Sequence, residues 1–198
     1  MPEDYAIFYN GPCCGASAPD HMHFQGALKK DIPLIAQYQK LREGSHILRY
    51  DSTLEEKKDF GIFCYYEESF RYIDKYTCPL FAFESNKPSI DFDLRWEIKH
   101  FAKVKNENEP KFNIFAWREN GRLIVLLIPR SKHRPDCFFA EGDDQLLVSP
   151  GALDMAGILV TARPEDFEKM NAEKAAEIIR EVGLPFEEAE AIANKYKQ

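Results

Sequence analysis

A hairpin signal near the middle of the chain constrains the fold more than any other feature. Two runs of apolar and β-branched residues, 112–117 and 123–128, flank the sequence Glu119-Asn120-Gly121. An Asn-Gly dipeptide suits a type I′ turn, which joins neighbouring antiparallel strands. The fold is therefore predicted to contain an antiparallel sheet.

Strands are predicted in other parts of the chain as well. Residues 5–9 are aromatic and β-branched and stop at Asn10-Gly11-Pro12, a strong turn signal. In residues 21–25 polar and apolar side chains alternate, so on a strand the three polar side chains would share one face. Residues 60–66 and 78–83 are also predicted to be strands.

Helices are predicted between and after these strands. Ser52 and Thr53, each followed three residues later by glutamate, resemble overlapping capping boxes of a short helix. Apolar residues at helical spacing predict an amphipathic helix over 90–104. Two helices are predicted to close the chain. The first begins at Pro164 and restarts at a cap on Asn171, and Gly183-Leu184-Pro185 separates it from the last, which runs through Tyr196.

Composition narrows the class of protein. The 198 residues are 44% hydrophobic and carry a net charge of −7, so a compact globular fold is expected and attraction to nucleic acid or to an anionic membrane is not. The longest apolar run, 123–128, is far shorter than the roughly 20 residues that cross a bilayer. Five cysteines without a Cys-x-x-Cys pair favour reduced thiols. We expect a cytoplasmic protein and assign neither a metal nor a cofactor.

The first third of the chain contains the residues best suited to chemistry. The loop 11–18 consists of small residues that let a ligand approach its backbone N–H groups. His21 and His23 follow it, and a neutral imidazole can attack phosphorus without a strong base. A surface pair of histidines and a metal site are the alternatives for the two imidazoles. The candidate phosphate-binding groups of the loop are Gly11, Gly15 and Ser17.

These residues resemble the active site of the histidine-triad (HIT-like) superfamily in its transferase branch. The motif His21-x-His23-x-Gln25 is similar to the His-x-His-x-Gln motif of that branch, which has Gln where the hydrolases have a third His. The resemblance continues, in order, through four segments of the GDP-galactose and GDP-glucose phosphorylases, which are related to galactose-1-phosphate uridylyltransferase and the diadenosine tetraphosphate phosphorylases. The segments are 76–84, 112–115, 128–130 and 152–160.

The resemblance implies a nucleotidyltransferase or phosphorylase that acts on a nucleoside diphosphate sugar or a dinucleoside polyphosphate. The nucleophile would be His23, which forms a covalent nucleotidyl-histidine and passes the nucleotide to phosphate or a sugar phosphate. Gln25 would bind the α-phosphate, and His21 would orient the site. Asn10 and Ser17 match polar loop positions of the uridylyltransferases. The alternative is a non-catalytic nucleotide-binding or scaffold fragment of such an enzyme.

The resemblance also implies an architecture of two related HIT-like lobes. The first would span residues 1–106 and the second 107–198, with the polar segment 106–110 at the boundary. Only four residues precede Tyr5, so the first lobe appears incomplete, with an open sheet edge. Because open edges invite pairing, we expect a homo-oligomer or a missing N-terminal partner. In the basic loop 130–134, Arg130 and Lys132 are candidate ligands of a phosphate or sugar phosphate, and a solvated loop is the alternative.

Overall fold

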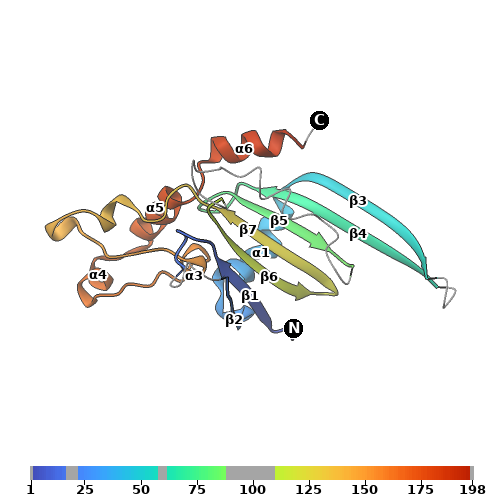
Figure 1. The fold of residues 1–198 in the computed structure, drawn as a ribbon, viewed down its shortest axis with the longest axis horizontal. Coiled ribbons are helices and arrows are strands. Elements are labelled where there is room, and N and C mark those ends of the chain that lie inside the picture. The colour runs from blue at the N-terminus through green and yellow to red at the C-terminus, as the bar shows by residue number, and fades with distance from the viewer. Residues whose placement is uncertain (1, 17–21, 58–61, 88–109, 197–198) are drawn as a thin grey trace.

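The computed structural model describes residues 2–16, 22–57, 62–87 and 110–196, and its described strands form one seven-stranded antiparallel sheet (Figure 1). The strand order is β2-β1-β6-β7-β5-β4-β3. Mixed strands and helices around this sheet confirm the predicted α+β class and its antiparallel character. The strands are β1 (Tyr5–Asn10), β2 (Phe24–Leu28), β3 (His46–Lys57), β4 (Ile62–Ile73), β5 (Leu80–Ser85), β6 (Phe112–Glu119) and β7 (Arg122–Pro129).

The predicted central hairpin is confirmed as β6 and β7. Their register runs from Phe112 opposite Pro129 to Glu119 opposite Arg122. Asn120 and Gly121 both adopt positive φ, 50° and 74°, as a type I′ turn requires of its two central residues. Local turn chemistry therefore sets the register at the centre of the sheet.

Strands from both sides of the predicted lobe boundary belong to this sheet. β1 pairs with β6, and β5 pairs with β7. The two strands from after residue 110, β6 and β7, therefore lie between strands from before residue 106. β2 and β3 occupy the two edges of the sheet among the described residues. β3 and β4 extend to one side as a long hairpin (Figure 1).

The predicted helices of the C-terminal region are confirmed. Pro164 begins α4, and the side chain of Asn171 accepts a hydrogen bond from the Lys174 amide to cap α5. The sequence analysis did not predict α1, which also has a proline in its first turn. The helical elements are η1 (Lys29–Asp31), α1 (Pro33–Glu43), η2 (Asp136–Phe138), η3 (Gly142–Asp144), α3 (Ala152–Met155), α4 (Pro164–Lys169), α5 (Ala172–Val182) and α6 (Phe186–Asn194).

Two local predictions are wrong in the described residues. Ser52 and Thr53 do not begin a helix but lie within β3, because a ladder with β4 runs from His46 to Lys57 and satisfies the backbone there. The strand predicted over 21–25 begins only at Phe24, so His23 lies just before β2. The helix predicted over 90–104 lies outside the described residues.

Helices cover both faces of the sheet and define two cores. In the larger core α1, α3 and α5 pack on one face of the sheet. There the rings of Trp117 and Tyr38 pack edge to face, with their centroids 5.1 Å apart. The second core packs α6 on the opposite face. Successive side chains of β1 alternate between them, so Phe8 belongs to the first core and Tyr9 to the second. Among the described residues no helix combines the length and the apolar character needed to span a bilayer.

Candidate functional site

The residues predicted to carry chemistry meet where β1 ends. The antiparallel ladder of β1 and β2 ends with Tyr9 opposite Phe24, so Asn10 follows its last pair on one strand and His23 precedes it on the other. Gln25 lies opposite Phe8, and residues directly opposite each other project to the same face. Asn10 and Gln25 therefore share the face on which α3 packs. His23 is half-buried and Gln25 is exposed.

Two predicted site residues cannot be placed. His21 and Ser17 lie outside the described residues, so their relation to His23 stays a prediction.

The loop after β1 folds tightly against a second backbone segment. Cys13 and Gly15 adopt positive φ, 56° and 86°. The Gly11 amide donates to the carbonyl of Phe112 at 3.1 Å, and the Cys14 amide donates to the carbonyl of Gly11 at 3.0 Å. A Cβ atom on Gly15 would lie only 2.4 Å from the Cα of Gly151. Glycine at position 15 is therefore required both for its backbone angle and for the close approach.

Several N–H groups of this loop lack an acceptor. Within the described parts of the chain, the amides of Cys13, Gly15 and Ala16 donate no hydrogen bond. Backbone amides in a loop that alternates between helical handedness form concave sites for anions. The loop can therefore offer donors to phosphate oxygens at the end of β1.

An amide network fixes the base of this loop. The Oδ1 atom of Asn10 accepts from the Ala152 amide at 2.6 Å and from Nδ2 of Asn113 at 3.0 Å. The same Nδ2 donates to the carbonyl of Cys14 at 2.9 Å. Asn113 is fully buried in β6, and its own Oδ1 accepts from Arg130 at 2.8 Å. The network joins β1, β6, the loop and the start of α3.

Asn113 was not among the residues predicted for the site. The signal that could have identified it is an amide side chain inside the apolar strand 112–117, because a buried polar side chain needs a specific set of partners. The two groups to which its Nδ2 donates, on Asn10 and Cys14, are more than ninety positions away, so the sequence alone did not show which groups it joins.

Arg130 lies beneath the loop rather than at its surface. The residue is 1% exposed, and each of the five N–H bonds of its guanidinium donates to a protein oxygen. In this conformation no N–H of Arg130 is left for a direct contact with phosphate. The predicted role as a direct phosphate ligand therefore requires these hydrogen bonds to rearrange.

Lys132 lies at the surface, where it forms ion pairs with Asp136 at 2.8 Å and with Glu181 at 2.7 Å. Hydrogen bonds to these two carboxylates raise the pKa of the Lys132 ammonium. Lys132 remains a candidate for binding a phosphate, in competition with the two carboxylates.

The two cysteines of the loop differ in their environment. Cys13 is exposed, whereas Cys14 is buried beneath the loop. Burial raises the pKa of the Cys14 thiol to about 11, and the nearby charge of Arg130 acts in the opposite direction. Cys14 is therefore a neutral thiol near pH 7 and packs as a small apolar side chain. Among the described residues no group of three or more His, Cys, Asp or Glu side chains could hold a metal ion.

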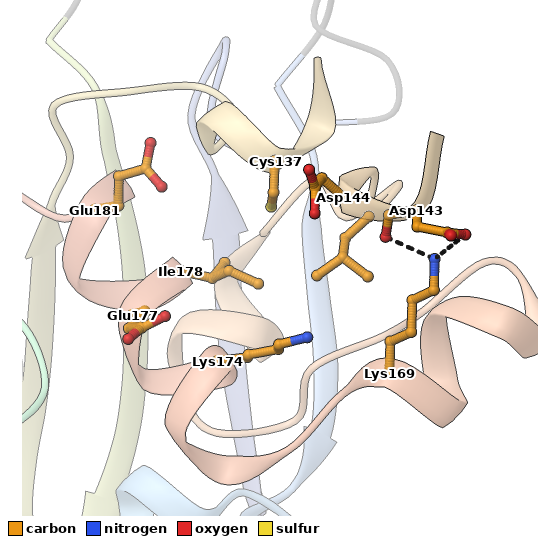
Figure 2. Close-up of a pocket in the computed structure, with 9 residues that line it drawn as sticks. Cys137, Asp143, Asp144, Lys169, Lys174, Glu177, Ile178 and Glu181 are labelled. Atoms are coloured by element: carbon orange, nitrogen blue, oxygen red, sulfur yellow. Dashed lines mark hydrogen bonds and ion pairs between the residues drawn. The ribbon is translucent and has the colours of Figure 1, made fainter. Parts of the chain in front are cut away.

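A separate cavity of about 250 Å³ lies between η2, η3, α4 and α5 (Figure 2). Cys137 and Ile178 line it together with charged side chains of both signs. Lys169 donates to the carbonyl of Asp143 at 2.8 Å and lies 3.7 Å from its carboxylate, so this lysine is already engaged. None of the residues predicted for the site lines this cavity.

Comparison with known proteins found one match. The model of a family described as a domain of unknown function, DUF4922, matches residues 1–28. This stretch contains β1, the glycine-containing loop, the two histidines and β2. Neither the curated proteins nor the solved structures gave a match.

Proposed function

We propose that this chain is a HIT-like nucleotidyltransferase or phosphorylase in which His23 carries the nucleotide covalently. The observation that supports the proposal best is the position of His23 at the end of β1. His23 is the residue before β2, and the β1–β2 ladder ends beside Asn10, after which comes a loop with three amides that donate no hydrogen bond within the described residues. A nucleophile beside N–H donors is the arrangement that attack on a phosphate ester needs.

The proposed first step is displacement at the α-phosphorus of a nucleoside diphosphate sugar. A ring nitrogen of His23 supplies the electron pair of a new P–N bond, and the bond from the α-phosphorus to the bridging oxygen breaks. The sugar 1-phosphate leaves with that oxygen and its electron pair. In the second step an oxygen of inorganic phosphate attacks the same phosphorus, the P–N bond breaks, and a nucleoside diphosphate leaves.

Two polar side chains are suited to hold the α-phosphate during both steps. Nδ2 of Asn10 donates no hydrogen bond within the described residues, because the contacts of this side chain are made by its Oδ1. Gln25 is exposed, lies two residues after His23 and shares a face of the sheet with Asn10. Both are neutral amides, so they donate to phosphate oxygens without repelling them. His21 and Ser17 complete the proposed site from outside the described residues.

The test is covalent labelling with a nucleotide donor that carries radioactive phosphorus in the α position. GDP-hexose and ATP are incubated separately with the protein, which is then denatured and exposed to acid or to alkali. We expect label that is stable in alkali and lost in acid, as for a P–N bond, and absent from His23→Gln. The matched control is His46→Gln, since His46 lies at the start of β3 and pairs with Asp74 at 3.0 Å.

The same experiment separates the proposed enzyme from a non-catalytic fragment. Binding of GDP or ATP is measured in parallel by calorimetry. A protein that binds a nucleotide but gains no label from either donor is a binding or scaffold protein, and the catalytic proposal is then wrong. Label that persists in His23→Gln would also overturn it.

A further inference from the structure

Arg130 is a buried cation without a carboxylate partner among the described residues. Its five N–H groups all donate to neutral oxygens, of which one belongs to the Asn113 side chain and the others to the backbone. Buried charges in proteins are normally paired with an opposite charge, because desolvation of an unpaired ion is costly. Burial accordingly lowers the pKa of the Arg130 guanidinium. The backbone acceptors are the carbonyls of Val182, Pro150, Lys132 and His133.

The protein offsets this charge only in part. The carbonyl of Val182 belongs to the last residue of α5, and a helix C-terminus carries roughly half a negative charge. Asp154 acts on Arg130 from a distance, but its two oxygens accept hydrogen bonds from the amides of Gly151 and Val160. A substantial part of the positive charge is therefore left without a partner in the described structure.

The remaining charge acts toward the loop at the end of β1. Asn113 links the guanidinium directly to the carbonyl of Cys14 and to the side chain of Asn10. The charge of Arg130 also acts on the Cys14 thiol, where it opposes the effect of burial on the pKa. The field of Arg130 thus reaches the backbone whose amides lack acceptors.

We propose that Arg130 is a positioning residue that supplies, from beneath the loop, the positive charge that retains the anionic part of the substrate. It acts through Asn113 and the loop backbone and does not touch the ligand. The proposal rests on the proposed function insofar as the ligand is a phosphate compound bound at this loop. The bound phosphate would be the missing counter-charge of the buried guanidinium.

The first test compares Arg130→Lys with Arg130→Gln. Both variants lose most of the hydrogen bonds of the guanidinium, but only lysine keeps the charge. Binding of inorganic phosphate and of GDP is measured by calorimetry, and the melting temperature of each variant is recorded. We expect both variants to melt below the unsubstituted protein, and Arg130→Gln to bind phosphate about tenfold or more weakly than Arg130→Lys, as the loss of one buried charge implies. If phosphate affinity follows only the melting temperature, and the lysine and glutamine variants of equal stability bind phosphate equally well, the proposal is wrong.

A second pair of variants applies if substitution of Arg130 prevents folding. Cys14→Asp and Cys14→Asn place side chains of nearly equal size beneath the loop, and only aspartate adds a negative charge. We expect Cys14→Asp to melt at a higher temperature than Cys14→Asn, because its carboxylate pairs with Arg130, and to bind phosphate more weakly. Weaker binding without the gain in melting temperature would mean that the new charge repels the ligand directly, and would refute a role of Arg130.

These measurements are independent of the labelling of His23. If phosphate binding depends on the charge at position 130 but no label forms on His23, the nucleotidyl transfer is wrong and the role of Arg130 stands. If His23 is labelled but Arg130→Gln and Arg130→Lys bind phosphate equally well, only the role of Arg130 is wrong.

Discussion

The close contact between the loop and the 150–151 backbone makes Gly15 the most informative position for a stability test. Substitution Gly15→Ala adds a Cβ atom 2.4 Å from the Cα of Gly151 and 2.9 Å from the carbonyl oxygen of Pro150. Both contacts are with backbone, so no flexible side chain can move away. A left-handed backbone costs an alanine about 1–2 kcal/mol. Overpacking adds about 1–3 kcal/mol, so the expected total is about 3 kcal/mol.

Gly142→Ala is the matched control. Gly142 also has a positive φ, 62°, but an added Cβ would meet nothing within 4 Å. Gly142→Ala should therefore lower the free energy of unfolding only by the cost of the left-handed backbone, about 1–2 kcal/mol. The difference between the two variants therefore isolates the contact between the loop and Gly151.

Urea unfolding followed by circular dichroism measures both variants. For a chain of this length each kcal/mol lowers the melting temperature by about 2–4 °C, so Gly15→Ala should melt several degrees below Gly142→Ala. Phosphate binding should weaken in Gly15→Ala alone, because the unpaired amides move with the loop. If the two variants unfold at the same urea concentration, the close packing described for Gly15 is incorrect.

Three further predictions concern other parts of the fold. Glu84 is buried, and hydrogen bonds from Arg42 and Tyr38 hold its pKa below the ordinary value although burial opposes this. Glu84→Gln should cost about 3 kcal/mol at neutral pH. The stabilisation that Glu84 provides is fully present above the ordinary carboxyl pKa and is lost as the pH falls through the lowered pKa. Acid unfolding curves of Glu84→Gln and of the unsubstituted protein should therefore converge at low pH. Asn171→Ala removes the cap of α5 and should cost about 1 kcal/mol in urea unfolding, with Asn171→Ser close to unchanged. An aromatic disulfide reagent should modify Cys13 rapidly and Cys14 only upon unfolding, as peptide mapping would show; equal rates would contradict the burial of Cys14.

Local chemistry in the sequence was sufficient for some of the elements. The turn at Asn120-Gly121 and the cap at Asn171 depend on backbone angles and hydrogen bonds within a few residues, so they could be predicted without knowledge of the fold. The capping pattern at Ser52 failed for the converse reason. There the ladder pairs Ser52 with Glu67 and Thr53 with Tyr66, so the hydrogen bonds between β3 and the following strand outweigh the local caps.

For the candidate site the sequence determined which groups are present, namely the histidine pair, the amide of Gln25 and the glycine loop. Only the tertiary structure decided where they act. The pairing of β1 with β2 brings His23, the residue before β2, to the end of β1, and the pairing of β1 with β6 brings Asn113 under the loop. Arg130 was predicted as a ligand of a phosphate or sugar phosphate, but it is buried, because the end of α5 and the segment at Pro150 fold over it. The burial of a residue and its hydrogen-bond partners depend on contacts between distant segments. They cannot be derived from the type of that residue and its spacing from its neighbours in the sequence.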